Sequence, residues 1–417
     1  MAAIPKYSVY IVTGDGTKYN VTNVLTELTL AEYDTQLAQT ATIELVNIVH
    51  NGSYLTSLFD VIDRVFVYAT YEGTTEEVFR GFVWEDDYNS GEKKILKLVC
   101  YDNLIYLQKS EICKYFSKGK KTEAICKDIF DDWGVNLKYE YKNITHPKLP
   151  LQGSISNVLI DDVLEKVRRQ TGEKYVIQSI QDVAHIKTVG SNSTIYEIVT
   201  KKNSGDVEHK KTMEDVITQV VITGKTDDND RTAIEATVKG KVSQYGTIQK
   251  TISKSEDTSI SESKKEAQEI LDDNGEPKEI ITLIDAVDIP FIRKGDLIKV
   301  TAGDIVGKYC LVLDIAHKAK SKTMNIECEL YKNKASTSSN TAANDGQNSA
   351  GKVLNLSGVA LYISSDAKNK STTVNGTYYL YDGIEKSGRY RITNSKSRVG
   401  KKPVGGNVTG WIDKEYV

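Results

Sequence analysis

Alternating hydrophobic and polar positions run through the N-terminal part of the chain, which is typical of half-buried strands. β-Branched and aromatic residues concentrate at 65–70, 76–84 and 95–102, and polar turns separate these segments. An Asp-Gly pair near residue 15 favours a hairpin turn, because glycine readily adopts a positive φ. Strands at this close spacing predict a barrel or sandwich for residues 1–112.

Between residues 113 and 205 the hydrophobic pattern changes to the period of a helix. One helix is predicted over 122–134 and a second over 156–172, and a glycine ends each of them. Strand patterns follow both helices, so this part is predicted to be a small α/β insertion. The apolar faces consist of Ile125, Ile129, Phe130 and Trp133 in the first helix, and of Leu159, Ile160, Val163, Leu164 and Val167 in the second.

Residues 206–332 return to the alternation of strands, as at 232–240 and 309–316. One helix interrupts them and is predicted over 263–274, with Gly275 past its end. Three successive parts, β, α/β and β, therefore make up the body of the chain. The predicted helix N-caps are Ser156 or Asn157 for the helix at 156–172, and a Ser263–Glu266 capping box for the later helix.

A polar segment at 333–351 separates this body from the C-terminal part of the chain. It contains no hydrophobic residue larger than alanine, so it cannot bury enough apolar surface to fold, and we expect a flexible linker. Residues 352–417 carry 11 Lys or Arg and 5 Asp or Glu, a net charge of +6. Residues 1–351 carry 43 and 52, a net charge of −9. The C-terminal part is predicted to be a separate basic module.

The composition indicates a non-secreted protein of several domains. At roughly 100–200 residues per domain, 417 residues predict about two to four domains. The overall net charge of −3 argues against a nucleic-acid-binding protein. No apolar run approaches the roughly 18 residues that a membrane helix needs, and the N-terminus lacks the pattern of a secretory signal.

Cysteines and histidines form no recognisable chemical motif. The five cysteines are odd in number and none has CxxC spacing, so we interpret them as reduced structural residues rather than disulfides or zinc ligands. None of the five histidines lies in HExxH. Neither a GxxxxGK[ST] phosphate loop nor a GxSxG nucleophile motif occurs.

Acidic residues give no clear site either. The run Asp227–Asp230 lacks the glycine and the distal glutamate of a calcium loop, which favours a hairpin tip. A carboxylate pair for glycoside hydrolysis stays open, because the separation of such a pair is set by the fold and not by spacing. We therefore predict no catalytic residue, no metal site and no cofactor, and a scaffold or binding protein is favoured over an enzyme.

The order of motifs resembles a known family. The N-terminal part contains FRGFVW, VCYDNLIYLQKS and KKTEAICKDIFDDWGV. The later part contains MEDVITQVVITGK, SQYGTIQKTI, a helix, PFIRKGDLIKV and GKYCLVLDIAHKAKSKTMNIECEL. This order is similar to that of the baseplate hub proteins of contractile phage tails and phage-tail-like bacteriocins, the late-control D or XkdQ-like family. The resemblance covers residues 1–332 and rests on the conjunction of these motifs.

The resemblance implies a mainly β protein with a small α/β insertion. Two β-barrel-like hub domains at 1–112 and 206–332 would flank the insertion at 113–205. In that family such domains form a trimeric ring that joins the tail tube to the central spike, with no catalytic site.

The partners that this implies are two further copies of the chain, the tail tube protein, the spike protein and the tape-measure protein. Sequence-specific nucleic acid and a membrane segment are not expected. The protein would assemble in the bacterial cytoplasm as part of a phage tail or phage-tail-like particle.

Residues 352–417 resemble a bacterial SH3-like β-barrel, most clearly in VTGWIDKEYV, YYLYDG and GRYRIT. Such domains of endolysins often bind cell-wall peptides or glycans. The segment VALYISSDA departs from the family pattern, so a wall-binding groove and a core or adapter surface both stay open. The aromatic residues that would line a groove for peptidoglycan or another partner are Tyr362, Tyr378, Tyr379, Tyr381, Trp411 and Tyr416.

Two other classes of protein are alternatives. A tail-associated lysin would degrade peptidoglycan and use the SH3-like part for targeting, but it needs a Cys/His or Glu-centred motif that the body does not show. A secretion-apparatus spike that carries an effector should add a long β-helical repeat where this chain has a linker. The sequence leaves open whether the particle is a virus or a headless bacteriocin, and which cell it meets.

Overall fold

The computed structural model of the chain describes residues 4–89, 94–199, 205–226, 232–254, 259–302, 305–331, 350–401 and 407–416. The chain divides into two compact units, Met1–Lys334 and Ala335–Val417. It is mainly β, as the sequence predicts. The predicted linker lies outside the described residues except for its last two positions, and so does the acidic run 227–230. Among the described helices, none is long and apolar enough to span a membrane.

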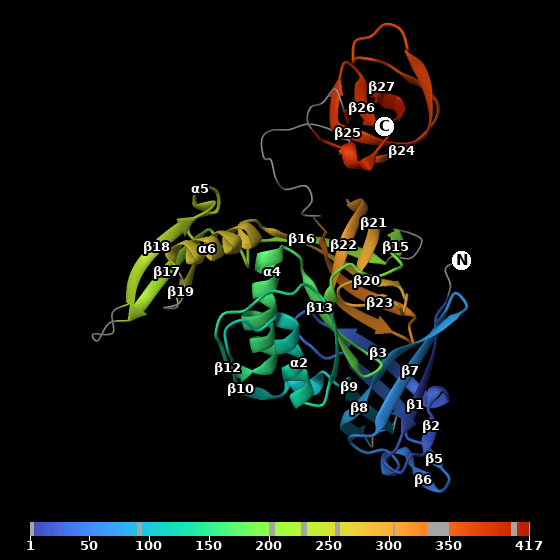
Figure 1. Cartoon of the computed structure of the whole chain (residues 1–417). Helices are drawn as coiled ribbons and strands as arrows, with labels where there is room; N and C mark the ends of the chain where they lie inside the picture. Colours follow the sequence, from blue (N-terminus) through green and yellow to red (C-terminus); the bar gives the residue numbers. More distant parts are fainter. Residues whose placement is uncertain are drawn as a thin grey trace. The chain divides into compact units, whose positions relative to one another are not determined.

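Two groups of strands form the large sheet of the first unit (Figure 1). The N-terminal half consists of β1 (Lys6–Val12), β2 (Lys18–Asn20), β3 (Leu25–Glu32), β4 (Thr40–Val46), β7 (Arg64–Tyr71), β8 (Thr74–Asn89) and β9 (Ile95–Tyr101). The C-terminal half consists of β15 (Glu197–Val199), β16 (Asp206–Thr212), β20 (Lys278–Val287), β21 (Leu297–Ala302), β22 (Ile305–Lys318) and β23 (Thr323–Leu330). The order is β16-β20-β23-β22-β3-β4-β9-β8-β7-β1-β2, with β21 paired to β22 and β15 to β21.

Several short elements connect the strands of the N-terminal half. A hairpin of two short strands follows β4, and single turns of 3-10 helix precede β3 and follow the hairpin. These elements are β5 (Val49–His50), β6 (Ser53–Tyr54), η1 (Thr22–Val24) and η2 (Leu55–Ser57).

The prediction of two β-barrels is wrong for the described residues, whose strand order closes no barrel. Strand β3 pairs with β4 on one side and with β22 on the other, so the two halves share one sheet. A closed barrel would need the outer strands of each half to pair with each other. Alternation predicts which face of a strand is buried, but it does not predict the neighbouring strand.

The edge strand β16 has the sequence DVEHKKT, and such charge discourages pairing with another chain.

Each half of the sheet has its own hydrophobic core. In the segment MNIECELY, alternation predicts an inward face made of Met324, Ile326, Cys328 and Leu330; the first three side chains are fully buried and Leu330 is half-buried. On β22 a β-bulge after Val312 shifts the alternation, so Val312 is buried and Leu313 only half-buried. A bulge adds one residue to one strand, and the hydrophobic pattern does not reveal it.

The α/β insertion follows β9 and has a separate core. Strand β10 pairs with β12, and β14 lies between β11 and β13. The elements are α1 (Ile105–Gln108), β10 (Glu111–Phe116), α2 (Thr122–Asp132), β11 (Asn136–Glu140), β12 (Leu149–Ser154), α3 (Ile155–Asn157), the π-helical η3 (Val158–Leu164), α4 (Glu165–Thr171), β13 (Tyr175–Ile180) and β14 (Val183–Thr188).

Both helices predicted in the insertion are present. The first is α2, and the second is the continuous run α3-η3-α4, which ends at Gly172 in the left-handed conformation. The predicted cap at Ser156 or Asn157 is wrong, because the helix already begins at Ile155 and its N-cap residue is Ser154. The sequence pattern did not reveal that the middle of this helix is π-helical, because its apolar residues lie on nearly the same helix face as they would in an α-helix.

The segment between β16 and β20 forms a three-stranded sheet of its own, with α6 packed along it (Figure 1). The predicted capping box is displaced by one turn: Ser259 and Glu262 form it, and Ser263 is buried inside the helix. Both serines fit the motif, and Ile270 and Leu271 of this helix pack against the sheet. The elements are β17 (Gln219–Thr226), β18 (Thr232–Lys239), α5 (Val242–Tyr245), β19 (Gln249–Ser253) and α6 (Ile260–Asn274).

The C-terminal unit is a four-stranded sheet in the order β24-β25-β26-β27. Its core includes Leu380, Ile392 and Ile412, all fully buried. One isolated bridge pairs Tyr362 with Trp411, but the strand ladders leave the order open, and an SH3-like barrel stays a prediction. The elements are β24 (Val353–Leu361), β25 (Thr372–Lys386), β26 (Arg389–Thr393), η5 (Lys396–Arg398), β27 (Gly410–Asp413) and η6 (Lys414–Tyr416).

Candidate functional site

Charged and polar side chains are buried where the insertion meets both halves of the large sheet. They come from β1, from the end of β3, from the residue after β9, from the loop between β20 and β21, and from β22. We call this group the junction cluster. It consists of Tyr7, Glu32, Asp102, Asp288, Arg293, Lys294, Asp296 and His317.

Arg293 links all three parts of the first unit. Its Nη2 and Nε donate to the two carboxylate oxygens of Glu32 on β3, at 2.8 and 3.0 Å. Its Nη1 donates to the backbone oxygen of Ser179 on β13, at 2.9 Å. Burial alone would raise the pKa of Glu32, but the charge and hydrogen bonds of Arg293 hold that pKa below its ordinary value.

Lys294 extends the same connection. Its Nζ donates to the backbone oxygens of Tyr33 and Gln36, at 2.9 and 2.6 Å, in the loop that follows β3. Its own backbone oxygen accepts from the Gln178 side chain of the insertion. Burial lowers the pKa of Lys294. A buried ammonium with two carbonyl acceptors fixes the position of that loop.

Two of the three aspartates of the cluster, Asp102 and Asp296, stabilise the backbone of the same region. Asp102 accepts from the backbone N–H groups of Gln39 and Leu104, each at 3.0 Å. Asp296 accepts from the backbone N–H of Arg293 at 2.9 Å. Burial raises the pKa of Asp102 to about 7 and that of Asp296 to about 6. Both carboxyl groups are therefore structural, since backbone donors occupy them.

His317 carries two protons in this environment. Its Nδ1 lies 2.6 Å from Oδ1 of Asp288, and its Nε2 lies 2.9 Å from the backbone oxygen of Ile292. Neither oxygen can donate a proton, so both ring nitrogens donate. The hydroxyl of Tyr7 donates to the other oxygen of Asp288 at 2.5 Å. Burial alone would lower the pKa of His317, but the Asp288 carboxylate raises it above its ordinary value.

The stability of the first unit should fall as the pH rises through the titration of His317. A histidine whose pKa is higher in the folded state stabilises the fold fully below its unfolded value of about 6.5. That contribution disappears as the pH rises through the folded-state pKa, because Nε2 then faces Ile292 without a proton. We expect the wild type to lose more free energy of unfolding between pH 6 and pH 9 than His317→Gln, measured by urea denaturation.

Asp102 and Asp296 titrate below or within this pH range, but they do so in both proteins. Their contributions to the pH dependence of the free energy of unfolding therefore largely cancel in the comparison. Tyr7 does not contribute, since burial raises its pKa far above this window. Equal losses in the wild type and in His317→Gln would contradict a doubly protonated His317.

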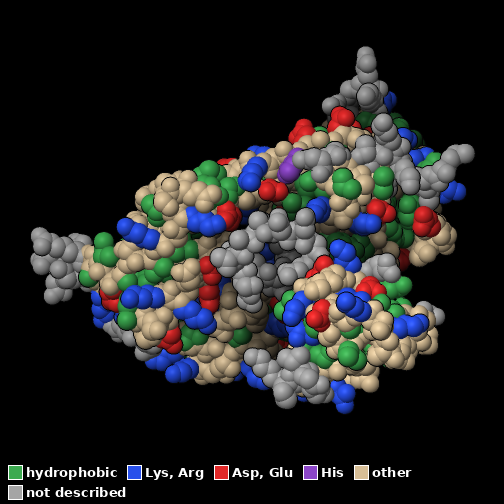
Figure 2. All heavy atoms as spheres, turned by 90° about the horizontal axis from the view of Figure 1, so that it is seen from above, with side chains coloured by type: hydrophobic (Ala, Val, Ile, Leu, Met, Phe, Trp, Pro, Cys, Tyr) green, Lys and Arg blue, Asp and Glu red, His purple; other side chains and the backbone are tan. Residues whose placement is uncertain are grey.

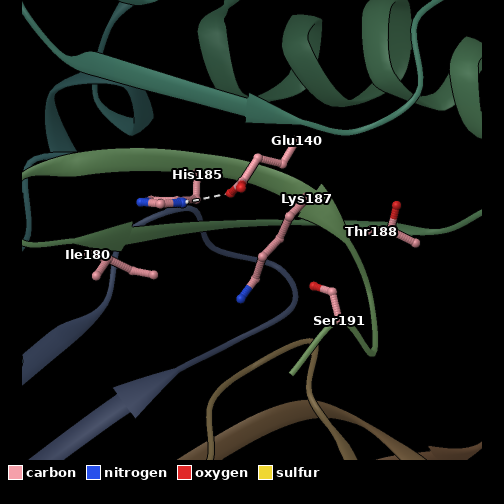
Figure 3. Close-up of a pocket in the computed structure, with 6 residues that line it drawn as sticks. All are labelled: Glu140, Ile180, His185, Lys187, Thr188 and Ser191. Atoms are coloured by element: carbon pink, nitrogen blue, oxygen red, sulfur yellow. Dashed lines mark hydrogen bonds and ion pairs between the residues drawn. The ribbon is translucent and has the colours of Figure 1, made fainter. Parts of the chain in front are cut away.

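A polar cleft lies next to the cluster, between the small sheet of the insertion and the loop after β14. It encloses about 420 Å³ and is lined by Glu140, Ile180, His185, Lys187, Thr188 and Ser191. Figure 3 shows Lys187 extending from β14 into this space, and Glu140 directed toward His185. Nδ1 of His185 lies 3.2 Å from the Glu140 carboxylate. No serine or cysteine nucleophile is hydrogen-bonded to this histidine among the described residues.

The described residues also contain no group of three His, Cys, Asp or Glu side chains that could hold a metal ion. Of the cysteines, Cys113 is exposed and the other four are buried, and all five are free thiols.

The predicted aromatic residues of the C-terminal unit fall into two groups. Tyr362, Tyr381 and Trp411 surround two arginines: Arg389 lies 3.3 Å from the ring centre of Tyr362, and Arg391 lies 5.8 and 5.2 Å from those of Tyr381 and Trp411. Tyr381 is 2% exposed, so it belongs to the interior.

The other three aromatic residues are Tyr378, Tyr379 and Tyr416. Tyr378 packs against the core, Tyr379 follows it on β25 and therefore points to the opposite face, and Tyr416 is exposed at the C-terminal end.

The junction cluster was missed in the sequence, although three of the motifs quoted above contain five of its residues, with His317 in GKYCLVLDIAHKAKSKTMNIECEL. VCYDNL supplies Asp102, and PFIRKGDL supplies Arg293, Lys294 and Asp296. Charged residues placed directly after an apolar segment normally indicate a solvated turn. The signal that could have indicated burial is the apolar sequence on both sides of Arg-Lys-Gly-Asp.

Comparisons with known proteins agree with this architecture. The 43 kDa tail protein of prophage MuSo2 from Shewanella oneidensis has a similar structure, with a TM-score of 0.55 and 12% identity, over 78% of this chain and 98% of that one. A tail protein from Neisseria meningitidis MC58 matches with a TM-score of 0.56 and 11% identity, over 79% of this chain and 97% of that one. The chain thus shares the fold of these two tail proteins.

Sequence comparison defines the family. The YQBQ-like family matches residues 31–330, and the chain belongs to that family. A curated relative, the phage-like element PBSX protein XkdQ of Bacillus subtilis (strain 168), is 24% identical over 238 residues, which are 55% of this chain and 71% of the relative.

Proposed function

We propose that the protein is a structural component of a phage tail or phage-tail-like particle, and that it forms the trimeric hub between tail tube and spike. The observation that carries the proposal is the shared fold with two tail proteins over almost their entire lengths. Membership of the YQBQ-like family supports it. In this proposal, hub domains at 1–112 and 206–332 flank the insertion at 113–205, and the linker at 333–351 leads to a module at 352–417.

The junction cluster supports a mechanical role. It ties the insertion and both halves of the sheet together through charged hydrogen bonds, which are short and strong. A component between a tube and a spike has to transmit force without changing shape. A closed ring of three copies needs an interface between neighbouring copies whose geometry closes the ring after the third copy.

Protein partners suit the visible surface. Figure 2 shows Lys and Arg side chains interspersed with Asp and Glu over the face that it displays, without a large area of one sign. Nucleic-acid-binding faces gather basic side chains. We therefore keep the tube protein, the spike protein and the tape-measure protein as the proposed partners, with assembly in the bacterial cytoplasm.

Light scattering on the purified protein tests the proposal. We expect a mass of about three times 46.4 kDa, either alone or after addition of the tube or spike protein. A chain that remains monomeric with both partners present would refute the hub.

Purified protein should also leave isolated peptidoglycan intact, and clearing of a cell-wall suspension would favour the lysin instead.

An exposed apolar surface near the β5–β6 hairpin supports assembly with another protein. Val49 and Tyr54 lie directly opposite each other on the hairpin and are 54% and 49% exposed. Exposed apolar groups that gather in one region often mark protein interfaces. Val46 and Ile48 just before the hairpin in the sequence, and Val61 and Ile62 after it, are also exposed.

Replacing Val49 and Tyr54 with aspartate should weaken assembly about tenfold or more, because two carboxylates would be buried without partners. Light scattering against protein concentration measures the effect. Ile363→Asp is the matched control, since this side chain is 78% exposed but lies in the C-terminal unit. Unchanged assembly of the double variant would exclude this surface from the interface.

For the C-terminal unit we propose that members of the set of six aromatic residues named above line a groove that binds peptidoglycan or another particle protein. The contact between Arg391 and the ring of Trp411 shows one aromatic face already paired with a cation. We expect Trp411→Ala to reduce binding to isolated cell wall about tenfold without unfolding the unit. Absence of binding by the wild type would favour the adapter role.

A further inference from the structure

The unused hydrogen-bonding capacity of the cleft in Figure 3 consists mainly of donors. Among the described residues, no hydrogen bond or ion pair involves Nζ of Lys187, and none involves the hydroxyls of Thr188 and Ser191. The carboxylate that lines the cleft is already engaged, because Glu140 contacts Nζ of Lys138 at 2.9 Å and His185 at 3.2 Å, and the two hydroxyls can donate as well as accept. An ammonium group cannot accept a hydrogen bond. The cleft is therefore suited to a ligand that accepts.

The fold holds these donors in place. His185 and Lys187 are two residues apart on β14, so both side chains leave the same face of the small sheet. The loop that carries Ser191 is attached to the second half of the large sheet through Asn192. The side chain of Asn192 accepts from the backbone N–H of Leu297 at 2.8 Å and donates to its oxygen at 2.9 Å.

The charge of the cleft matches a single negative group. Lys187 is the lining residue that carries a positive charge without a partner among the described residues, since Lys138 is paired with Glu140. Burial lowers the pKa of Lys187, and the nearby Asp296 carboxylate opposes this effect. One positive charge balances a carboxylate, whereas a phosphate dianion normally requires several cations or a set of backbone N–H groups.

The size of the cleft indicates more than an isolated ion. Protein pockets for whole ligands enclose roughly 300–1,000 Å³, and this cleft encloses about 420 Å³. Ile180 adds an apolar wall beside the donors. A peptide with an acidic side chain would present a carboxylate to Lys187 and aliphatic groups to Ile180.

We propose that this cleft is a docking site for an acidic side chain of a peptide segment, whose carboxylate accepts from Lys187, Thr188 and Ser191. The choice of a peptide rests on the proposed function, because a tail component meets other proteins. The requirement for one carboxylate rests on the cleft alone.

Histidine resonances of the full chain provide the test. The chain contains five histidines, so protein labelled with 13C at histidine Cε1 gives few signals, and His185 lines the cleft. The probe is the blocked tripeptide Ala-Glu-Ala, with blocked Ala-Gln-Ala as its neutral control. We expect saturable movement of the His185 signal with the Glu peptide, and at least about tenfold weaker binding with the Gln peptide or with Lys187→Met.

Two further variants separate charge from structure. Lys187→Arg should retain most of the binding, because it keeps the positive charge. Lys127→Met is the matched control, since Lys127 lies on α2 with an exposed side chain and should leave binding unchanged. The other four histidine signals report whether each variant is folded.

Three results would overturn the inference: no saturable movement with the Glu peptide, equal affinity for the Gln peptide, or tighter binding of inorganic phosphate than of the Glu peptide. Incorporation of the chain into tail particles is measured separately. Normal incorporation without peptide binding would refute the docking site alone, and peptide binding without incorporation would refute the proposed function alone.

Discussion

Arg293→Met should lower the free energy of unfolding of the first unit by about 3–5 kcal/mol. The change removes both hydrogen bonds to Glu32 and leaves that carboxylate buried, with its side chain 5% exposed and without its main cation. It also removes the donor to Ser179, so the insertion loses a contact with the second half of the sheet. Urea denaturation of the full chain measures the loss.

Arg169→Met is the matched control for this variant. The side chains of Arg293 and Arg169 are both 19% exposed, and each is paired with a glutamate at 2.8 Å. However, the partner of Arg169 is Glu266, which is 43% exposed, so water replaces the lost bond and the cost should be about 0.2–1 kcal/mol. The double variant Glu32→Met, Arg293→Met should recover part of the stability, because no charge remains unpaired. A loss below about 1 kcal/mol for Arg293→Met alone would contradict the importance of the buried pair.

Gly295→Ala should destabilise the same region by about 2–5 kcal/mol through two separate effects. Gly295 has a φ of +84°, which costs a residue with a Cβ about 1–2 kcal/mol. The new Cβ would also lie 2.7 Å from Cβ of Val176 on β13, so the insertion and the loop of Arg293 would have to move apart. Thermal or urea unfolding of the full chain gives the total.

Gly119→Ala separates these two effects. Gly119 has a φ of +96°, but nothing lies within 4 Å of an added Cβ. We expect a loss of about 1–2 kcal/mol there, from backbone strain alone. The difference between the two variants measures how tightly β13 packs on the junction loop. Equal losses would show that the contact with Val176 relaxes at no cost.

The local pattern of the sequence predicts much of the fold. Period-2 alternation correctly places β7, β8 and β9, and it gives the buried face of β23 with Met324, Ile326 and Cys328. The 3.6-residue period correctly gives α2, with Ile125, Ile129 and Phe130 buried. These features depend on neighbours within one element, and such neighbours are visible in the sequence.

Contacts between distant segments could not be predicted in this way. The pairing of β3 with β22 merges two expected barrels into one sheet, and nothing in either strand specifies the other. Glu32 and Arg293 are 261 positions apart, so each looks like an ordinary surface charge in its local sequence. The site in the cleft was missed for the same reason, because Glu140, Lys187 and Ser191 converge only after the insertion has folded.

The pairing of β3 with β22 also has a consequence during synthesis. Strand β3 ends at Glu32, and its partner on β22 begins at Ile315 in the register of the pair. At roughly 5–20 residues per second, a ribosome needs on the order of 15–60 s to make the intervening chain. During this time β3 has β4 beside it but an open edge on its other side, and open edges recruit strands from other chains. Nascent chains on neighbouring ribosomes are therefore at risk of cross-pairing, and a chaperone that covers this edge would raise the yield of folded protein.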